Sequence, residues 1–428
     1  MLKKFIKHRL VQDTLVLFGV QISAYLLPLV TLPYLTRILG PANFGLLALG
    51  SAMVLYFMVI TEYGFAVTGT RRVAIVQDDP AQVARVYSSI MACKLCLMGF
   101  SFLVLVGIVA ATPKLQVHWQ LYLVSFLLVL GYCLSPNWLF QGLQRMKFVA
   151  YSDYGAKLIS VGLIFLLIRK SSDYLLAAAV QTGGFFLSAC IGLCLVFFVI
   201  RLRPVRPCWK DMREMMLEGW PVFLSMASMT VTTSSNTVIL GMVTTPDQVG
   251  FLSAASRLII AARALTNPVT NAVYPHMSQL AAKSREKGLQ LLERQLIWTC
   301  APFLLVSLGM LLFAPLVVRI LYGPKYVETG VLLRLMCLTP FVHSIGMCFG
   351  NYYMLAFGYE KEWSRIIRRM MVLNFISVFA LMALMRPVRA IAVTITLMDI
   401  FTAGSCVLFY RRTAGKSRED TAAAVEQA

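Results

Sequence analysis

The sequence has few charged residues. Only 14% of its 428 residues are Asp, Glu, Lys or Arg, whereas about 25% is usual in a soluble domain. Hydrophobic residues reach 59%. This scarcity of charge excludes a soluble protein of this size and indicates a membrane protein.

Three other features are missing. The chain lacks the segments of about 10 strictly alternating residues that mark a transmembrane β-barrel. It also has no connection long enough to form a soluble domain and no clustered acidic motif at a membrane interface, features that a membrane polymerase or glycosyltransferase would be expected to show. The apolar runs are long and apolar on all sides, so the predicted fold class is an all-α integral membrane protein. Without a large connection or an acidic motif, the protein is predicted not to be an enzyme.

The apolar runs predict twelve membrane-spanning helices. A hydrocarbon core of about 30 Å needs roughly 20 helical residues, and each run is near that length. The predicted spans are 13–36, 44–70, 88–112, 119–142, 150–169, 174–200, 219–243, 249–275, 295–318, 330–357, 370–385 and 389–410. A second span follows the first directly, so we expect the basic N-terminal segment to be retained rather than cleaved as a signal peptide.

The connections between the predicted spans alternately contain many and few Lys and Arg residues. With the N-terminus inside, the inner segments hold 26 of them and the outer connections hold 8, as the positive-inside rule requires. Both termini are therefore predicted to be cytoplasmic. This asymmetry accounts for the net charge of +20 without a nucleic-acid partner.

A short motif occurs twice, which suggests an internal repeat. Leu39-Gly40-Pro41 predicts a turn between the first two spans. The motif Pro41-x-x-x-Gly45 returns as Pro246-x-x-x-Gly250, 205 residues later, as a duplicated transporter would require. We therefore predict a six-helix N-terminal lobe at 1–205, a six-helix C-terminal lobe at 206–410 and a disordered cytoplasmic tail at 411–428, with the lobes around a central cavity.

Nine charged residues fall within the predicted spans, where a charge costs about 2.5 to 3.5 kcal/mol on insertion scales. They are Asp13, Glu62, Lys94, Asp153, Lys157, Arg257, Arg263, Arg334 and Asp399. Asp13, Asp153 and Arg334 lie near span ends, where they can reach water. Lys94 and Lys157 lie about 10 Å from the inner face, by rise per residue, and their long stems could snorkel to it. The other four are deeper.

The eighth span contains a polar stripe. Arg263, Asn267 and Asn271 recur every four residues, and Asn267 corresponds to Glu62 in the repeat register. Such a stripe predicts a face toward a cavity rather than lipid. The alternative is a set of structural pairs, for example Glu62 or Asp399 held by an Arg of the other half.

The seventh span adds many hydroxyl groups, which either line the same cavity or bond to their own helix. They come from Ser225, Ser228, Thr230, Thr232, Thr233, Ser234 and Ser235, next to Asn236. Basic residues slightly outnumber acidic ones inside the spans, which favours an anionic group such as a phosphate in transit. The predicted substrate-binding residues are Arg257, Arg263, Asn267, Asn271, Glu62, Lys94, Lys157 and Asp399. No metal site is predicted, since Cys93 and Cys96 fit small buried thiols better than a ligand pair.

The first 75 residues resemble a known family. The segment Pro33-Tyr-Leu-Thr-Arg-Ile-Leu-Gly-Pro41, then Phe44-Gly45, Tyr63-Gly64-Phe65 and Arg71-Arg72-Val73-Ala74, look like the opening of the Wzx-type polysaccharide-biosynthesis flippases. These belong to the multidrug/oligosaccharidyl-lipid/polysaccharide exporter superfamily. To the end of the chain the resemblance is weaker but consistent in span count and loop lengths. The resemblance implies two six-helix lobes around a central cavity.

The resemblance also implies a function: moving undecaprenyl-diphosphate-linked oligosaccharide across the bacterial inner membrane by alternating access. It implies no cofactor. The expected partners are this lipid-linked glycan and membrane lipid, with a polysaccharide polymerase and a chain-length regulator as possible protein partners. The alternative is a multidrug exporter of the same superfamily, driven by Na⁺ or H⁺, which would need a cavity dominated by carboxylates. Glu62 and Asp399 are available for that role, but the Arg residues argue against it.

Overall fold

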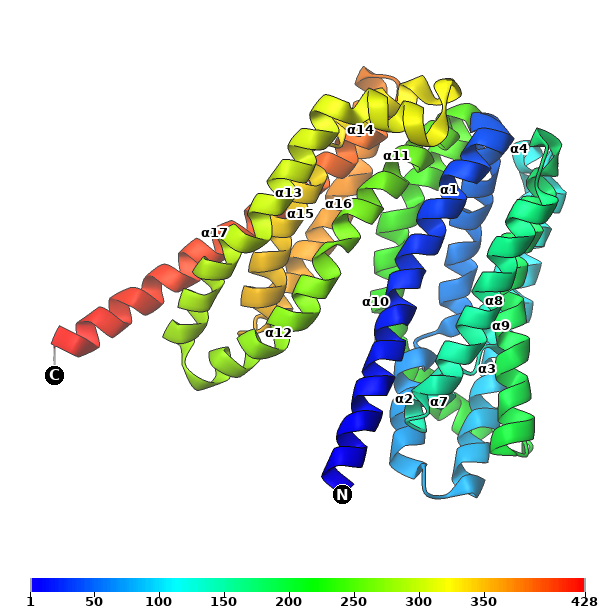
Figure 1. The fold of residues 1–428 in the computed structure, drawn as a ribbon, viewed down its shortest axis with the longest axis horizontal. Coiled ribbons are helices and arrows are strands. Elements are labelled where there is room, and N and C mark those ends of the chain that lie inside the picture. Colours follow the sequence, from blue (N-terminus) through cyan, green and yellow to red (C-terminus); the bar gives the residue numbers. More distant parts are fainter. Residues whose placement is uncertain (1, 427–428) are drawn as a thin grey trace. The chain divides into compact units, whose positions relative to one another are not determined.

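The protein is helical throughout the part that the structure, a computed structural model, describes (Figure 1). Residues 30–271 and 273–413 are described in full, and residues 2–29, 272 and 414–426 by their backbone. No strand occurs among these residues, and nine of the described helices are long and apolar enough to cross a membrane. The predicted class of all-α integral membrane protein is thereby confirmed.

The chain forms two compact units, Met1–Gly250 and Phe251–Ala428. The predicted lobe boundary at 205/206 rests on the repeat rather than on compactness, and it stays a prediction. Most of the predicted tail, from 414 to 428, lies outside the fully described residues.

The first unit contains ten α-helices. In chain order they are α1 (Leu2–Glu62), α2 (Phe65–Val76), α3 (Pro80–Ala111), α4 (Pro113–Gln116), α5 (Trp119–Ser125), α6 (Leu127–Leu134), α7 (Asn137–Gly142), α8 (Met146–Leu167), α9 (Tyr174–Cys194) and α10 (Trp209–Val243). A short 3₁₀ turn, η1 (Ser171–Asp173), precedes α9, and a π-helical segment, η2 (Leu195–Ile200), continues it.

The second unit is built mainly from α11 (Pro246–Ala264), which begins just before the boundary, and the helices that follow it. These are α12 (Thr266–Lys283), α13 (Arg285–Tyr322), α14 (Val327–Leu335), α15 (Thr339–Met347), α16 (Glu360–Leu384) and α17 (Pro387–Glu426), together with η3 (Pro324–Tyr326) and the π-helical η4 (Cys348–Leu355).

The span count differs from the predicted twelve. Nine helices qualify among the described residues, and the bent pair Pro324–Leu335 and Thr339–Leu355, with an angle of 41°, makes a tenth at the position of the predicted span 330–357. The predicted seventh span lies in α10, which is helical but not among the nine, since Ser and Thr interrupt its apolar run. The predicted first span lies partly outside the fully described residues, so the count of twelve stays a prediction.

The predicted turn at Leu39-Gly40-Pro41 is confirmed. Gly40 has φ 74° and ψ 172° and separates two helical stretches within α1. A positive φ of this kind is readily available only to glycine.

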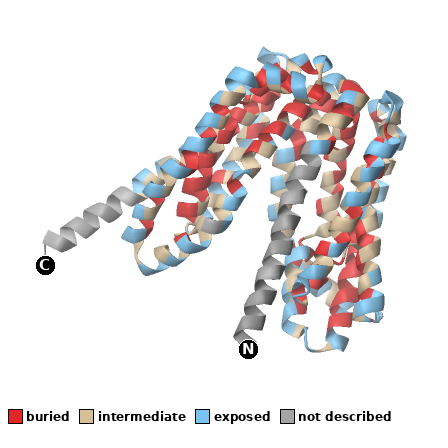
Figure 2. Cartoon of the chain, viewed as in Figure 1, coloured by how far each residue is buried: buried red, intermediate tan, exposed pale blue. Residues whose placement is uncertain are grey.

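The buried residues of each unit pack between its own helices, and exposed apolar residues line their outer faces (Figure 2). One core of the first unit joins α2, α3, α7 and the start of α10, and it includes Leu202 from the connection between η2 and α10. That connection is further held by the backbone N–H of Val205, which donates to Ser88 Oγ at 2.9 Å. The basic segment between the predicted lobes is therefore anchored to the first unit.

Candidate functional site

A buried ion pair joins α1 and α3 in the first unit. Lys94 Nζ donates to Glu62 Oε1 at 2.8 Å and to the carbonyl of Tyr132, on α6, at 2.9 Å. The Lys94 side chain is 0% exposed, so it does not snorkel to the interface. Glu62 Oε2 is buried with no hydrogen-bond partner. Two predicted substrate residues are thus brought together, and the partner of Glu62 is a lysine of the same half rather than an arginine of the other.

The helix is interrupted beside this pair. Within the predicted span 44–70, α1 ends at Glu62 and α2 begins at Phe65. Between them Tyr63 has φ 46° and Gly64 has φ 83°. Sequence reasoning missed this break, although an isolated glycine inside an apolar run was a signal for it.

The other charges of the first unit lie on α8. Ser188 Oγ, on α9, donates to Asp153 Oδ1 at 2.6 Å. Lys157 is half-buried and makes no hydrogen bond or ion pair with the described residues. Lys157 therefore remains available to an anionic ligand.

The second unit contains its own ion pair. Arg263 Nη2, on α11, donates to Asp399 Oδ2, on α17, and both side chains are largely buried. Arg263 Nε is buried without a partner. This is a structural pair of the kind offered as the alternative in the sequence analysis, since an arginine holds Asp399. Both of its members, however, come from the second unit.

The polar stripe predicted on the eighth span is divided. A break at Leu265 separates α11 from α12, so Arg263 lies on one helix while Asn267 and Asn271 lie on the next. Asn267 and Asn271 are exposed, whereas Arg263 is not. The predicted span 249–275 is nevertheless supported, since Pro246–Asn271 qualifies as a single candidate membrane span.

Arg257 differs from Arg263. Its side chain is exposed, and it makes no hydrogen bond or ion pair with the described residues. It lies one and a half turns before Arg263 on the same helix. Of the two arginines predicted to bind substrate, Arg257 is the one with no carboxylate beside it among the described residues.

Most of the α10 hydroxyl groups bond to their own helix. Ser225, Ser228, Thr232 and Thr233 each donate to the carbonyl four residues earlier, at 2.8 to 3.1 Å. Ser235 Oγ instead lies 2.8 Å from the hydroxyl of Tyr56 on α1. The hydroxyl protons of α10 are thus largely used in hydrogen bonds to their own helix, which was one of the two alternatives for this span. The hydroxyl oxygens can still accept a hydrogen bond.

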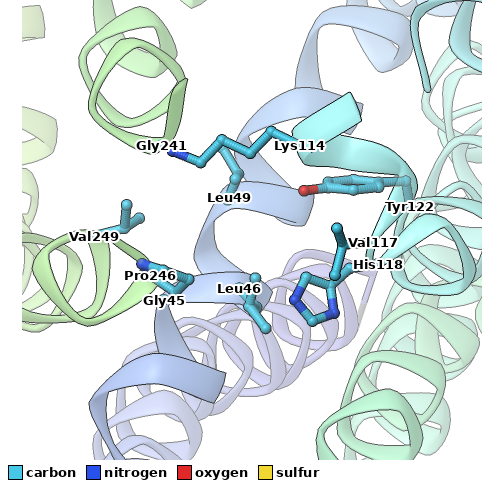
Figure 3. Close-up of a pocket in the computed structure, with 10 residues that line it drawn as sticks. All are labelled: Gly45, Leu46, Leu49, Lys114, Val117, His118, Tyr122, Gly241, Pro246 and Val249. Carbon is cyan, nitrogen blue, oxygen red and sulfur yellow. The ribbon is translucent and has the colours of Figure 1, made fainter. Parts of the chain in front are cut away.

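A cavity of about 160 Å³ lies at one end of α10 in the first unit (Figure 3). Its lining includes Gly45, Lys114, His118, Tyr122 and Pro246. Lys114 Nζ donates to the carbonyl of Met242 at 3.1 Å and of Thr244 at 2.6 Å, at the last turn of α10. This ammonium group caps a helix C-terminus, and the cavity is far too small for a lipid-linked oligosaccharide.

No group of three or more His, Cys, Asp or Glu residues in the described part of the chain could hold a metal ion. All ten cysteines are free thiols.

A family described as "Polysaccharide biosynthesis protein" matches residues 10–281. Two relatives carry the description "Putative O-antigen transporter". The one from Escherichia coli (strain K12) is 30% identical over 95% of this chain and 97% of its own length. The one from Shigella dysenteriae is 29% identical over 83% of this chain and 88% of its own length.

Two solved structures share the fold. An inward-facing multidrug resistance MATE family transporter of the MOP superfamily has a TM-score of 0.75 and 14% identity, over 95% of this chain and 99% of its own. The lipid II flippase MurJ in an inward closed conformation has a TM-score of 0.69 and 15% identity, over 92% of this chain and 87% of its own. At these identities the likeness concerns the fold alone.

Proposed function

Since the chain belongs to the polysaccharide biosynthesis protein family, we propose that it flips a lipid-linked polysaccharide unit across the bacterial inner membrane. The substrate class is undecaprenyl-diphosphate-linked oligosaccharide, such as an O-antigen unit, and the chain moves it by alternating access. Family membership makes the chain a transporter rather than an enzyme, which confirms the expectation from sequence.

One observation carries this proposal: each unit holds a basic residue among its apolar helices that no carboxylate neutralises. These residues are Lys157 in the first unit and Arg257 in the second. A cation left without a partner in a membrane protein is costly and marks a functional site by default. A diphosphate supplies the missing negative charge, and the planar guanidinium of Arg257 can bind phosphate oxygens in pairs.

The remaining predicted site residues divide into two groups under this proposal. The pairs Lys94–Glu62 and Arg263–Asp399 hold their helices in place and set the local charge to zero. Asn267 and Asn271 are exposed on α12, and the amide of Asn271 offers donors and acceptors to a glycan. Direct contact with the diphosphate is therefore assigned to Arg257 and Lys157 rather than to Arg263.

The physical task fits this arrangement. The glycan and diphosphate cannot cross hydrocarbon, because polar and charged groups lose their hydrogen bonds to water there. A polar interior supplies replacement partners, while the polyprenyl tail remains in lipid. Both termini face the cytoplasm in this scheme, and a polysaccharide polymerase and a chain-length regulator act on the product outside.

The alternative of a cation-coupled drug exporter receives support from the shared fold with a MATE family transporter. It requires carboxylates free to bind cationic drugs. Glu62 and Asp399 each already bind a basic side chain, so their charge is neutralised within the protein. The flippase is favoured for this reason.

The test is complementation of a strain that lacks its own O-antigen flippase. Expression of this chain should restore surface polysaccharide and leave the susceptibility to cationic drugs unchanged. If drug resistance rises and surface polysaccharide does not return, the exporter alternative holds and the proposal fails. The level of the protein in the membrane is measured in both assays.

A further inference from the structure

Three aromatic side chains meet where the first helix breaks. The ring of Tyr63 stacks on Phe223, with ring centroids 4.8 Å apart and an interplanar angle of 12°. Trp220 completes the group, with its centroid 5.6 Å from that of Phe223 and 6.3 Å from that of Tyr63. We call Tyr63, Trp220 and Phe223 the aromatic platform.

The backbone beneath the platform is strained. Tyr63 has φ 46°, which is uncommon for a residue with a bulky side chain. Close packing enforces it: a Cβ atom on Gly219 would lie 2.8 Å from the carbonyl oxygen of Tyr63, and one on Gly64 would lie 2.7 Å from Val222 Cβ. Strain of this kind persists where the surroundings over-determine it, and it is concentrated at functional sites.

The platform is open on one side. Trp220 is 51% exposed, although its ring is the largest of the three. By contrast Trp138, in the core of the same unit, is 3% exposed. A large aromatic face is therefore available to a ligand rather than filled by the protein.

One backbone acceptor is freed next to Trp220. Pro221 follows Trp220 inside α10 and has no N–H, so the carbonyl of Leu217 loses the hydrogen bond it would otherwise accept within the helix. A hydroxyl group of a ligand would find a partner there.

We infer that the aromatic platform binds a sugar ring of the transported glycan. A pyranose presents C–H bonds on its flat face, and these meet the negative face of an aromatic ring. Its hydroxyl groups point outward in the ring plane, where the free carbonyl of Leu217 can accept a hydrogen bond. This inference rests on the proposed function, and it separates the contact for the sugar from the cations that would hold the diphosphate.

Trp220 has a second explanation, which the same helix allows us to test. Tryptophan anchors helices at the membrane interface without binding any ligand. Trp209 lies eleven residues earlier, on nearly the same face of α10, and is 76% exposed. No ring contact is recorded for Trp209, so it serves as a matched control.

The experiment measures binding of a soluble glycan to the purified full-length protein. The probe is the repeat-unit oligosaccharide released from the surface polysaccharide of the source strain, without its lipid. Trp220→Ala should weaken binding about tenfold, the scale of one lost aromatic contact. Trp220→Phe should retain most of the affinity because it keeps an aromatic face, and Trp209→Ala should bind as the wild type does.

Each other result overturns the inference. Wild-type affinity in Trp220→Ala, or equal losses in Trp209→Ala and Trp220→Ala, would leave only an interfacial anchor. Absence of oligosaccharide binding by the wild-type protein would also refute sugar binding by the platform. Surface polysaccharide restored by the same wild-type protein in cells would then keep the proposed function intact, so the two failures are distinguishable. Thermal stability of each variant shows whether a loss of binding reflects misfolding.

Discussion

Gly45 and Gly250 each lie against the backbone of the other's motif. A Cβ atom on Gly45 would lie 1.9 Å from the carbonyl oxygen of Pro246, and one on Gly250 would lie 2.1 Å from that of Pro41. The contact is therefore reciprocal: each glycine meets the proline of the other P-x-x-x-G segment. A two-fold relation between two copies of one element produces reciprocal contacts of this type. The motif that suggested a repeat in the sequence is also where its two copies touch.

Alanine at either glycine should destabilise the protein. The obstructing atoms belong to backbone, which cannot rotate away, so helices must separate at a cost of about 1 to 3 kcal/mol. We expect Gly45→Ala and Gly250→Ala each to lower the thermal midpoint in detergent and to reduce surface polysaccharide. Gly107→Ala is the matched control, because nothing lies within 4 Å of an added Cβ there. Unchanged midpoints in both variants would contradict the close contact.

Removal of Arg263 alone should cost more than removal of the whole pair. Arg263→Met leaves Asp399 buried without its partner, which costs about 3 kcal/mol. In the double variant Arg263→Met with Asp399→Asn, no isolated charge remains, so most of the lost stability should return. Membrane protein levels and thermal midpoints of the two single variants and the double variant measure this difference.

The same four proteins also separate the two roles of Arg263. If Arg263 positions the helices, the double variant should recover transport together with stability. If it binds substrate directly, the double variant should be stable but inactive. A double variant as unstable as the single ones would show that no ion pair forms.

Which parts of this picture could be predicted from sequence depends on the range of the interactions. The helices follow from long apolar runs, and the turn at Gly40 follows from the local preference of Gly-Pro. These signals lie within a few residues of the structure they determine, so they could be read directly. The buried charges could likewise be identified, because any charge in an apolar run needs an explanation.

The partners of those charges could not be read in the same way. Lys94 meets Glu62 across 32 positions and Arg263 meets Asp399 across 136, so each pairing depends on how whole helices pack. The break at Tyr63 was missed for the same reason: contact with Gly219 on α10 stabilises it, and local sequence alone favours a continuous helix. Tertiary packing decided both cases.

A surface ion pair should make stability depend on pH. Arg72 Nε donates to Glu218 Oε2 at 2.9 Å, and Nη2 donates to Oε1 at 2.5 Å. These bonds hold the pKa of Glu218 below its usual value. A lowered pKa in the folded state adds stability above the ordinary pKa of a glutamate, and this stability is lost as the pH falls through the folded value.

Glu218→Gln should therefore be slightly less stable than the wild type at pH 7, and this deficit should shrink at pH 3. Both groups are partly exposed, so the difference should stay below about 1 kcal/mol and shrink in high salt. Thermal midpoints at the two pH values provide the measurement. Glu286→Gln, which removes an exposed carboxylate with no ion pair recorded for it, should show no such dependence. A Glu218→Gln deficit that grows at low pH would refute the assignment.

The C-terminal end of α17 should lie in the cytoplasm. The asymmetry of 26 inner against 8 outer Lys and Arg residues sets this orientation. A reporter enzyme that folds only outside the cytoplasm should be inactive when fused after Arg412, and a cytoplasmic reporter at the same position should be active. The reverse pattern would require an odd number of spans and would overturn the predicted cytoplasmic position of the C-terminus.

Arg257 provides the most demanding prediction, because it concerns the diphosphate itself. Arg257→Ala should reduce surface polysaccharide at least about tenfold, since one charge-assisted contact to phosphate is worth more than 1.4 kcal/mol. Arg257→Lys keeps the charge but loses the planar fork of donors, so it should give an intermediate level. Arg334→Ala is the control: this arginine is exposed and donates to a backbone carbonyl, that of Leu311 at 3.3 Å, and its loss should leave transport near wild type.

Because Arg257 has no ion-pair partner among the described residues, its removal leaves no opposite charge unpaired, and the Arg257→Ala variant should reach wild-type levels in the membrane. Full surface polysaccharide from a well-expressed Arg257→Ala protein would sink the assignment, and an equal loss in Arg334→Ala would show that any arginine in these helices matters for insertion rather than for the substrate.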